Sequence, residues 1–308
     1  MEFVTLDVFT QKRFLGNPLA VVKINPGTTL TQEQKQIIAR EFNYSETVFL
    51  HLAPSTSSAE VPEWKIDIFL VNAEVPFAGH PTIGTAVYAL SKLSKTQRGR
   101  FICKAGPLDL VYDAATKQAR AGIPFNIHRH SRTYPLDSLY TLQPGLRQHL
   151  QSSSQEIEQS HVDVVSVVKG MTFIFVRLPS LAALETVGLH GQSFQFQRDE
   201  GWDVGVLMSM YYVLLPSQDG TMKLRTRMIE GMFEDPATGS ASCGLAALLA
   251  LKAGIKGETV KVEMTQAVEM GRQSDIGVDV TMDGQGEVSK IELIGSAVEV
   301  MEGKVYYE

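Results

Sequence analysis

The sequence predicts an α+β protein built from two similar halves, and three observations support this prediction. The chain has 308 residues, and hydrophobic cores rarely grow beyond about 250 residues before a chain divides into domains. Segments that alternate like β-strands are interspersed with segments that have the apolar periodicity of helices. Residues 78–86 read AGHPTIGTA and residues 233–241 read FEDPATGSA, so the pattern Pro-x-x-Gly-[Ser/Thr]-Ala occurs twice.

The bulk composition is that of a globular protein, with 44% hydrophobic and 20% charged residues. A net charge of -6 and a pI near 5.7 argue against nucleic-acid and anionic membrane partners, which bind clustered Lys and Arg. The one basic cluster, HRHSR at residues 128–132, is interpreted as a solvated linker. Two cysteines cannot build a disulfide framework, and no Cys or His spacing suggests structural zinc. The N-terminus lacks a signal-peptide pattern, so we expect a cytoplasmic protein.

The first half opens with two predicted strands, at residues 2–10 and 19–24, separated by a Gly-Asn-Pro turn. Thr31 and Gln34 have the spacing of a capping box and predict a helix over residues 32–42, which Asn43 ends. A further strand is expected over residues 46–52. Glu46 therefore lies where helix gives way to strand, at the start of an apolar run. Position alone leaves open an exposed edge carboxylate or a catalytic group.

The two motif segments follow the same order of predicted elements. In the first half, a strand (64–71) and a loop (72–81) precede a helix (82–93); in the second, strands (211–216 and 222–229) and a loop (230–236) precede a helix (237–254). The shared order indicates a duplicated unit in which Pro81 corresponds to Pro236. Both helices are rich in small residues, and the second is apolar almost all round, so we expect each to lie inside its domain.

The loop before each helix suggests carboxylate binding and acid/base chemistry. The first turn of a helix presents unpaired backbone N–H groups, and two such ends facing one cleft would hold a carboxylate and stabilise negative charge beside it. His80 and Asp235, immediately before Pro81 and Pro236, are acid/base residue types in matching places. The alternative is that the Gly, Ser and Thr residues only cap helices and that His80 is a core or capping residue.

Several motifs in order along the chain resemble the phenazine-biosynthesis PhzF-like family within the diaminopimelate epimerase-like fold. They are DVFT (7–10), GNPLAVV (16–22), SETVFL (45–50), FAGHPTIGTA (77–86), EDPATGSA (234–241) and MGRQS (270–274). The resemblance spans nearly the whole chain. It implies two pseudo-symmetric α+β domains, each a rolled antiparallel sheet around a central helix. The expected halves are residues 1–126, with 295–308 returning to the first domain, and 127–294, with the active site in the cleft between them.

Residue by residue, the resemblance implies that Glu46 is a general acid/base that moves a proton between carbons of a small carboxylate substrate. His80 and Asp235 match its polar partners, and Ser240 with the backbone at Gly79 and Gly239 matches the groups around the substrate. No cofactor and no metal are implied. A working Glu exchanges protons near neutral pH, and an apolar cleft is expected to raise its pKa. A homodimer is one of the expected oligomeric states.

Departures from related proteins narrow this prediction. Cysteine-based racemases use one cysteine from each half, whereas this chain has Ala78 at the first such position and Asp235-Pro236 near the second, so that mechanism is not expected. Cys243 is expected in the core. Val71-Asn72 stands where many family members have Thr-Pro, which leaves the substrate open. The alternatives are a binding or interaction module that keeps the cleft, and a metal hydrolase using His80 and Asp235, which lacks a His-rich ligand spacing.

Overall fold

The computed structural model describes residues 1–52, 61–217 and 219–307. The chain forms two compact units, of which the first contains Met1–Ile123 and Glu292–Glu308 and the second contains Pro124–Ile291. No helix in these described ranges is long and apolar enough to cross a membrane.

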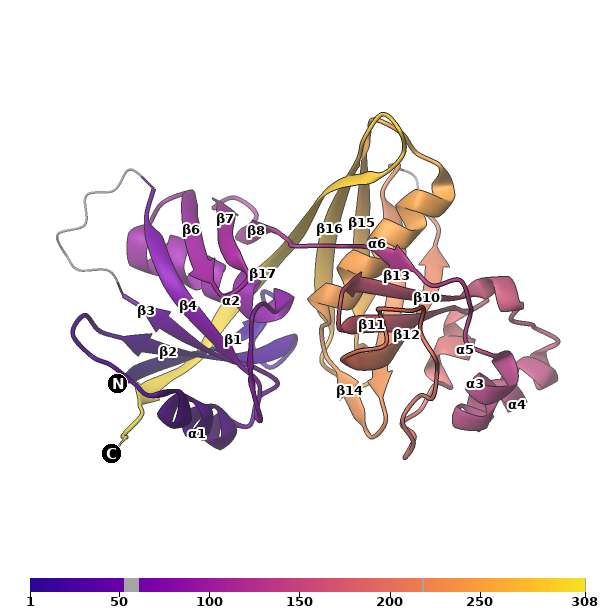
Figure 1. Cartoon of the computed structure of the whole chain (residues 1–308), viewed down its shortest axis with the longest axis horizontal. Helices are drawn as coiled ribbons and strands as arrows, with labels where there is room; N and C mark the ends of the chain where they lie inside the picture. The colour runs from indigo at the N-terminus through magenta and orange to yellow at the C-terminus, as the bar shows by residue number, and fades with distance from the viewer. Residues whose placement is uncertain (53–60, 218, 308) are drawn as a thin grey trace. The chain divides into compact units, whose positions relative to one another are not determined.

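The described part of the first unit contains eight strands whose pairings close into a ring, and Figure 1 labels them. In ring order these are β1 (Glu2–Val8), β2 (Asn17–Ile24), β3 (Thr47–His51), β4 (Glu63–Phe69), β6 (Arg98–Cys103), β7 (Gly106–Asp113), β8 (Gln118–Gly122) and the later part of β17 (Val288–Lys304). The last strand closes the ring because β17 pairs with both β8 and β1. A short strand, β5 (Glu74–Val75), forms a hairpin with β4.

The second unit repeats this pairing order. Its strands are β9 (His128–Arg129), β10 (Val162–Val168), β11 (Met171–Arg177), β12 (Val206–Leu215), β13 (Met222–Glu230), β15 (Thr259–Gln266) and β16 (Ser274–Met282). Each pairs with the next in this order, and β14 (Phe233–Asp235) forms a hairpin with β13 as β5 does with β4. The predicted two-fold repetition of an α+β unit is confirmed.

Each sheet is mixed rather than wholly antiparallel. The parallel pairs are β2 with β3 and β4 with β6 in the first unit, and β11 with β12 and β13 with β15 in the second. In every case a helix lies in the connection between the two strands. This is expected physically, because a parallel pair needs a long crossover whereas an antiparallel pair can be joined by a tight turn.

Helix α1 (Gln32–Phe42) has the predicted bounds and caps. Thr31 accepts a hydrogen bond from the Gln34 backbone, the Gln34 side chain accepts one from the Thr31 backbone, and Asn43 adopts the left-handed conformation at φ 52°. The second unit carries three further α-helices and a short 3₁₀ turn near its hydrophobic core. These are α3 (Leu136–Leu142), α4 (Pro144–Ser153), α5 (Leu181–Glu185) and the turn at Gln159–His161.

One buried helix packs against the strands of each unit (Figure 1). All ten residues of α2 (Gly79–Tyr88) are buried, and the helix contacts β1, β2, β3, β7 and β8 before it continues into a π-helical turn at Ala89–Ser94. Helix α6 (Gly239–Ala253) contacts β10, β11, β15 and β16 and ends at Gly254, as predicted. The complete burial of α2 and the apolar surface of α6 leave neither helix with a face to offer water, so both lie inside their units.

The register of the repeat differs from the predicted one. Counted from the two helix starts, EVPFAGHPTIGTA (74–86) corresponds to EDPATGSASCGLA (234–246). A β-carbon on Gly84 would lie 2.5 Å from Val8, and one on Gly244 would lie 2.5 Å from Val167, so equivalent glycines let each helix approach a strand closely. The predicted match of Pro81 with Pro236 is therefore wrong by five residues, because the shared six-residue pattern falls on different helical turns.

Candidate active site

Glu46 directly precedes β3 and follows the short turn after α1. The parallel pairing of β3 with β2, in which Thr47 lies opposite Ala20, fixes the backbone at this point. The Glu46 side chain keeps 16% of its surface exposed, so it is neither an exposed edge carboxylate nor sealed from solvent. A carboxylate in this position can meet a ligand.

His80 occupies the first turn of α2, and its side chain is only 3% exposed. Its Nδ1 lies 3.0 Å from Glu46 Oε2, and its Nε2 lies 3.2 Å from the backbone oxygen of Pro18 in β2. A carbonyl oxygen only accepts hydrogen bonds, so Nε2 carries a proton and Nδ1 faces the carboxylate. The two predicted residues, 34 positions apart in the sequence, are thus brought into direct contact.

This geometry places one shared proton between Nδ1 and Oε2. The contact is either an imidazolium donating to a carboxylate or a carboxylic acid donating to a neutral imidazole. Burial alone raises the pKa of Glu46, but attraction to His80, the hydrogen bond from His80 and one from Ser45 outweigh it, so the pKa lies below its usual value. The prediction that the site raises this pKa is wrong, because it counted burial and left out the buried partner.

Gly79 is the first residue of α2 and is buried. The preceding residue, Ala78, is extended and makes no side-chain capping bond, while its carbonyl accepts from both the backbone N–H and the hydroxyl of Thr82. No capping side chain of Ala78 therefore accepts from the backbone N–H groups in the first turn of α2. The predicted substrate contact at Gly79 requires such uncapped N–H groups.

Asp235 lies in the second unit, at the end of β14, and is buried. Its Oδ2 accepts a hydrogen bond of 2.6 Å from the Thr238 hydroxyl, and its backbone oxygen accepts one of 2.8 Å from Gln266 Nε2. The same Gln266 amide donates to Thr238 Oγ1 at 3.0 Å and accepts from the Thr238 backbone at 3.3 Å. Asp235 is thus held in a network that also fixes the start of α6.

Gln266 was not predicted as a site residue. It is fully buried at the end of β15, 31 residues from Asp235 in sequence. A single glutamine at a strand end matches no motif, so no sequence signal identifies it. Only the parallel pairing of β13 with β15, which sets Gln266 opposite Thr226, brings its amide to this network.

Gly239 and Ser240 open α6 as Gly79 and His80 open α2. Gly239 is buried, whereas Ser240 remains partly exposed. The predicted site residues thus form two groups, Glu46 with Gly79 and His80 in the first unit, and Asp235 with Gly239 and Ser240 in the second. That both groups line one cleft stays a prediction.

The two cysteines are free, and Cys243 is fully buried in α6, where burial raises its pKa. Its placement in the core is confirmed. The helix-cap positions Ala78 and Thr238 carry no thiol, and that paired cysteine bases are not used stays a prediction.

Comparison with known proteins identifies the family. The family model described as phenazine biosynthesis-like protein matches residues 6–303. An uncharacterized isomerase of Pasteurella multocida is 32% identical over 250 residues, covering 81% of this chain and 77% of that protein. The trans-2,3-dihydro-3-hydroxyanthranilate isomerase of Pseudomonas aeruginosa is 29% identical over 317 residues, covering 99% of each chain.

Solved structures agree on the fold. A PhzF-family phenazine biosynthesis protein of Bacillus anthracis superposes with a TM-score of 0.77 at 21% identity, covering 100% of this chain and 99% of that one. A hydroxyproline epimerase of Agrobacterium vitis reaches 0.59 at 14% identity, covering 99% and 90%. At such identities the likeness concerns the fold alone, and it extends from PhzF-family proteins to epimerases. With a family model matched nearly end to end and named isomerases among its relatives, the chain belongs to the phenazine biosynthesis-like family and is an isomerase.

Proposed function

We propose that the protein moves a proton between two carbons of a small carboxylic acid, with Glu46 as the general acid/base and without a cofactor. The observation that carries this proposal is the contact of 3.0 Å between Glu46 Oε2 and His80 Nδ1, in a site where the histidine is almost wholly buried. A partly exposed carboxylate with a buried proton-bearing partner is suited to take up and return one proton.

The lowered pKa of Glu46 defines the resting state, because it keeps the group ionised near neutral pH. The carboxylate takes the proton of a substrate C–H bond, and the electron pair of that bond stays on the substrate. The carboxylic acid then gives the proton to a second carbon of the same substrate, so Glu46 ends as it began. His80, anchored through Nε2 on the Pro18 carbonyl, holds the carboxyl group in place and balances the carboxylate charge before the first transfer and after the second.

The proposal assigns the second unit to substrate binding. Ser240 supplies a hydroxyl, and the backbone N–H groups at Gly79 and Gly239 meet the substrate carboxylate at two helix starts, where the helix dipole favours an anion. Asp235 is held by Thr238 and Gln266, so it is suited to orient a polar or amino group on the substrate. This arrangement requires the predicted cleft between the two halves.

The substrate class follows from these groups and from the relatives. A ring or chain that carries a carboxylate and an amino or hydroxyl group would use both the helix starts and Asp235. Three relatives from Pseudomonas are named for isomerising trans-2,3-dihydro-3-hydroxyanthranilate. We therefore propose a small cyclic or amino-bearing carboxylic acid, for which that compound is the first probe.

The test is proton exchange in deuterated water. Purified protein is incubated with trans-2,3-dihydro-3-hydroxyanthranilate and a panel of cyclic amino acids, and carbon-bound deuterium is followed by NMR. Glu46→Gln keeps the shape but removes the transferable proton, so it should slow exchange by about 10²- to 10⁴-fold while ligand binding persists. Glu41→Gln, the same change at an exposed position on α1, should leave the rate unchanged.

Full exchange in the Glu46→Gln variant would contradict the assignment of the base. A protein that binds members of the panel yet exchanges no carbon-bound proton would contradict the proposed activity and support the binding-module alternative. Equal losses in the Glu46 and Glu41 variants would indicate a general effect on folding, which thermal unfolding of each variant reports separately.

A further inference from the structure

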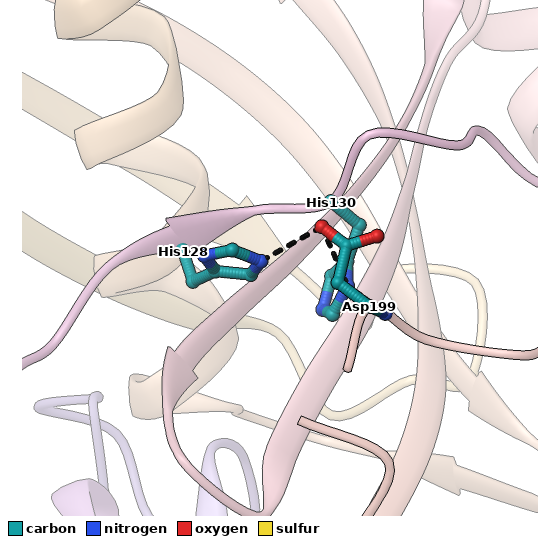
Figure 2. A group of neighbouring side chains, drawn as sticks. All are labelled: His128, His130 and Asp199. Carbon is teal, nitrogen blue, oxygen red and sulfur yellow. Dashed lines mark hydrogen bonds and ion pairs between the residues drawn. The ribbon is translucent and has the colours of Figure 1, made fainter. Parts of the chain in front are cut away.

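A second cluster of polar side chains lies in the second unit and contains none of the predicted site residues. His128 and His130 project from the same side of the segment that begins with β9, and Asp199 meets them from a loop 69 residues further along (Figure 2). One potential ligand atom from each residue lies within 4.8 Å of the other two. The predicted solvated linker at residues 128–132 is thus wrong, because β9 pairs with β10 and His130 is buried.

The distances suit a small metal ion. His128 Nε2 lies 2.9 Å from Asp199 Oδ2, and His130 Nδ1 lies 3.8 Å from the same oxygen. Zinc bound to nitrogen and oxygen at about 2.0–2.2 Å in a tetrahedral site sets its ligands about 3.3–3.5 Å apart. The two measured separations bracket this range.

Neighbouring groups hold the rings as metal ligands are usually held. His130 Nε2 lies 3.0 Å from the Ser166 hydroxyl, while its Nδ1 accepts a hydrogen bond of 3.1 Å from the Asp199 backbone, so the Nδ1 lone pair points toward Asp199. His128 stacks on Trp202 with ring centroids 4.4 Å apart. Ser131 donates to Asp199 through both its backbone and its hydroxyl. Such outer partners fix the tautomer and orientation of ligating groups.

Access also fits. The side chains of His128 and Asp199 are 30% and 24% exposed, whereas that of His130 is fully buried. An ion could therefore enter from solvent, meet three protein ligands and keep a water molecule in the fourth position. It would have to replace the hydrogen bond from the Asp199 backbone to His130 Nδ1.

We propose that His128, His130 and Asp199 form a binding site for one zinc-type divalent transition-metal ion per chain. Two imidazole nitrogens and one carboxylate oxygen are a donor set typical of zinc. The ion would tie the loop around Asp199 to the β9 segment and so stabilise the second unit. This inference is independent of the proposed isomerase chemistry, and it departs from the sequence-based expectation that the chain binds no metal.

The test uses untagged, full-length protein stripped of metal by a chelator. Cobalt(II) is titrated in and followed by its visible absorption, which reports coordination number, and zinc is then added as a competitor. We expect one tetrahedral cobalt per chain, displaced by zinc, and a higher Tm with zinc present. Asp199→Asn and His128→Gln should each weaken binding at least tenfold. His149→Gln, the same change on helix α4 outside the cluster, should bind as wild type does.

The proposal is overturned if the wild-type protein takes up no cobalt or zinc at one equivalent per chain, since the three side chains then form only a hydrogen-bonded clamp. It is also overturned if Asp199→Asn and His128→Gln bind cobalt as tightly as His149→Gln does. The two cluster variants change partly exposed side chains, and far-UV circular dichroism of the metal-free proteins verifies that each is folded.

Discussion

The starts of α2 and α6 have the same local architecture but different chemistry. Each helix follows a short hairpin strand, begins at a glycine and carries a second glycine five residues later that packs against a strand. The residue after the first glycine is His80 in one unit and Ser240 in the other. The packing positions are thus repeated, whereas the positions proposed to face a ligand have diverged.

Strand register extends the comparison to Glu46. Thr47 lies opposite Phe69, which lies opposite Glu74 in the β4–β5 hairpin. In the second unit, Ser209 lies opposite Ile229, which lies opposite Glu234. The residue before Ser209 is Met208, so the second unit has an apolar side chain where the first has its carboxylate.

The two units therefore share one scaffold, but only the first carries the contact between Glu46 and His80. A carboxylate that is largely removed from solvent needs a partner, and Glu46 has one in His80. The second unit has neither member at these positions and instead holds Asp235 through Thr238 and Gln266. This difference predicts unequal responses to equivalent mutations.

The largest expected contrast is in turnover. His80→Gln removes the buried partner of Glu46 and should lower kcat about 10²- to 10³-fold on a verified substrate, because the carboxylate loses its charge-balancing group. Ser240→Ala, at the equivalent place on α6, should lower kcat less than tenfold and act mainly on KM. Steady-state kinetics of both variants measure this. A larger loss of kcat from Ser240→Ala would reverse the assignment of roles.

A second contrast concerns the packing glycines. Gly84→Ala sets a methyl group within 3.0 Å of both Val8 and Leu19, whereas Gly244→Ala meets one such contact, with Val167. Each change should lower the free energy of unfolding by about 1–3 kcal/mol, with the greater loss for Gly84→Ala. Urea unfolding measures both. Gly284→Ala, which meets nothing within 4 Å, is the control, and equal stability of all three variants would contradict the close packing of Gly84 and Gly244 against strands.

A third contrast compares two threonine hydroxyls near the helix starts. Thr238 donates to the Asp235 carboxylate at 2.6 Å, and Thr82 donates to the Ala78 carbonyl at 2.7 Å. Hydrogen bonds to charged acceptors contribute about 1.5–3 kcal/mol and neutral ones about 0.5–1.5. Thr238→Val should therefore destabilise more than Thr82→Val in denaturant unfolding. The opposite order would indicate that Asp235 does not depend on Thr238.

The smallest expected effect is the pH dependence of stability that Glu46 contributes. Its pKa is lowered in the folded protein, so the folded state binds this proton less readily than the unfolded state does. The resulting stabilisation is present above the unfolded carboxylate pKa and is lost as the pH falls through the lower folded value. The free energy of unfolding should thus fall between neutral and acidic pH more steeply in wild type than in Glu46→Gln. Parallel pH profiles would show that the pKa is unchanged on folding.

The sequence by itself determined the features that depend on neighbouring residues. The cap of α1 needs only Thr31, Gln34 and Asn43, and the end of α6 needs only Gly254, so both were predicted correctly. The motifs that indicated the family are likewise short and contiguous. Local hydrogen bonding and backbone conformation decide these features, and the sequence displays them directly.

Only the tertiary structure decided the features that join distant residues. The repeat register, the sign of the Glu46 pKa shift, the burial of His130 and the role of Gln266 all depend on partners about 30 or more positions away. A six-residue pattern could not reveal which glycine packs against a strand, and an apolar run after Glu46 could not reveal His80 beside it. Packing and electrostatics act through space, so their outcome appears only when the folded chain brings these groups together.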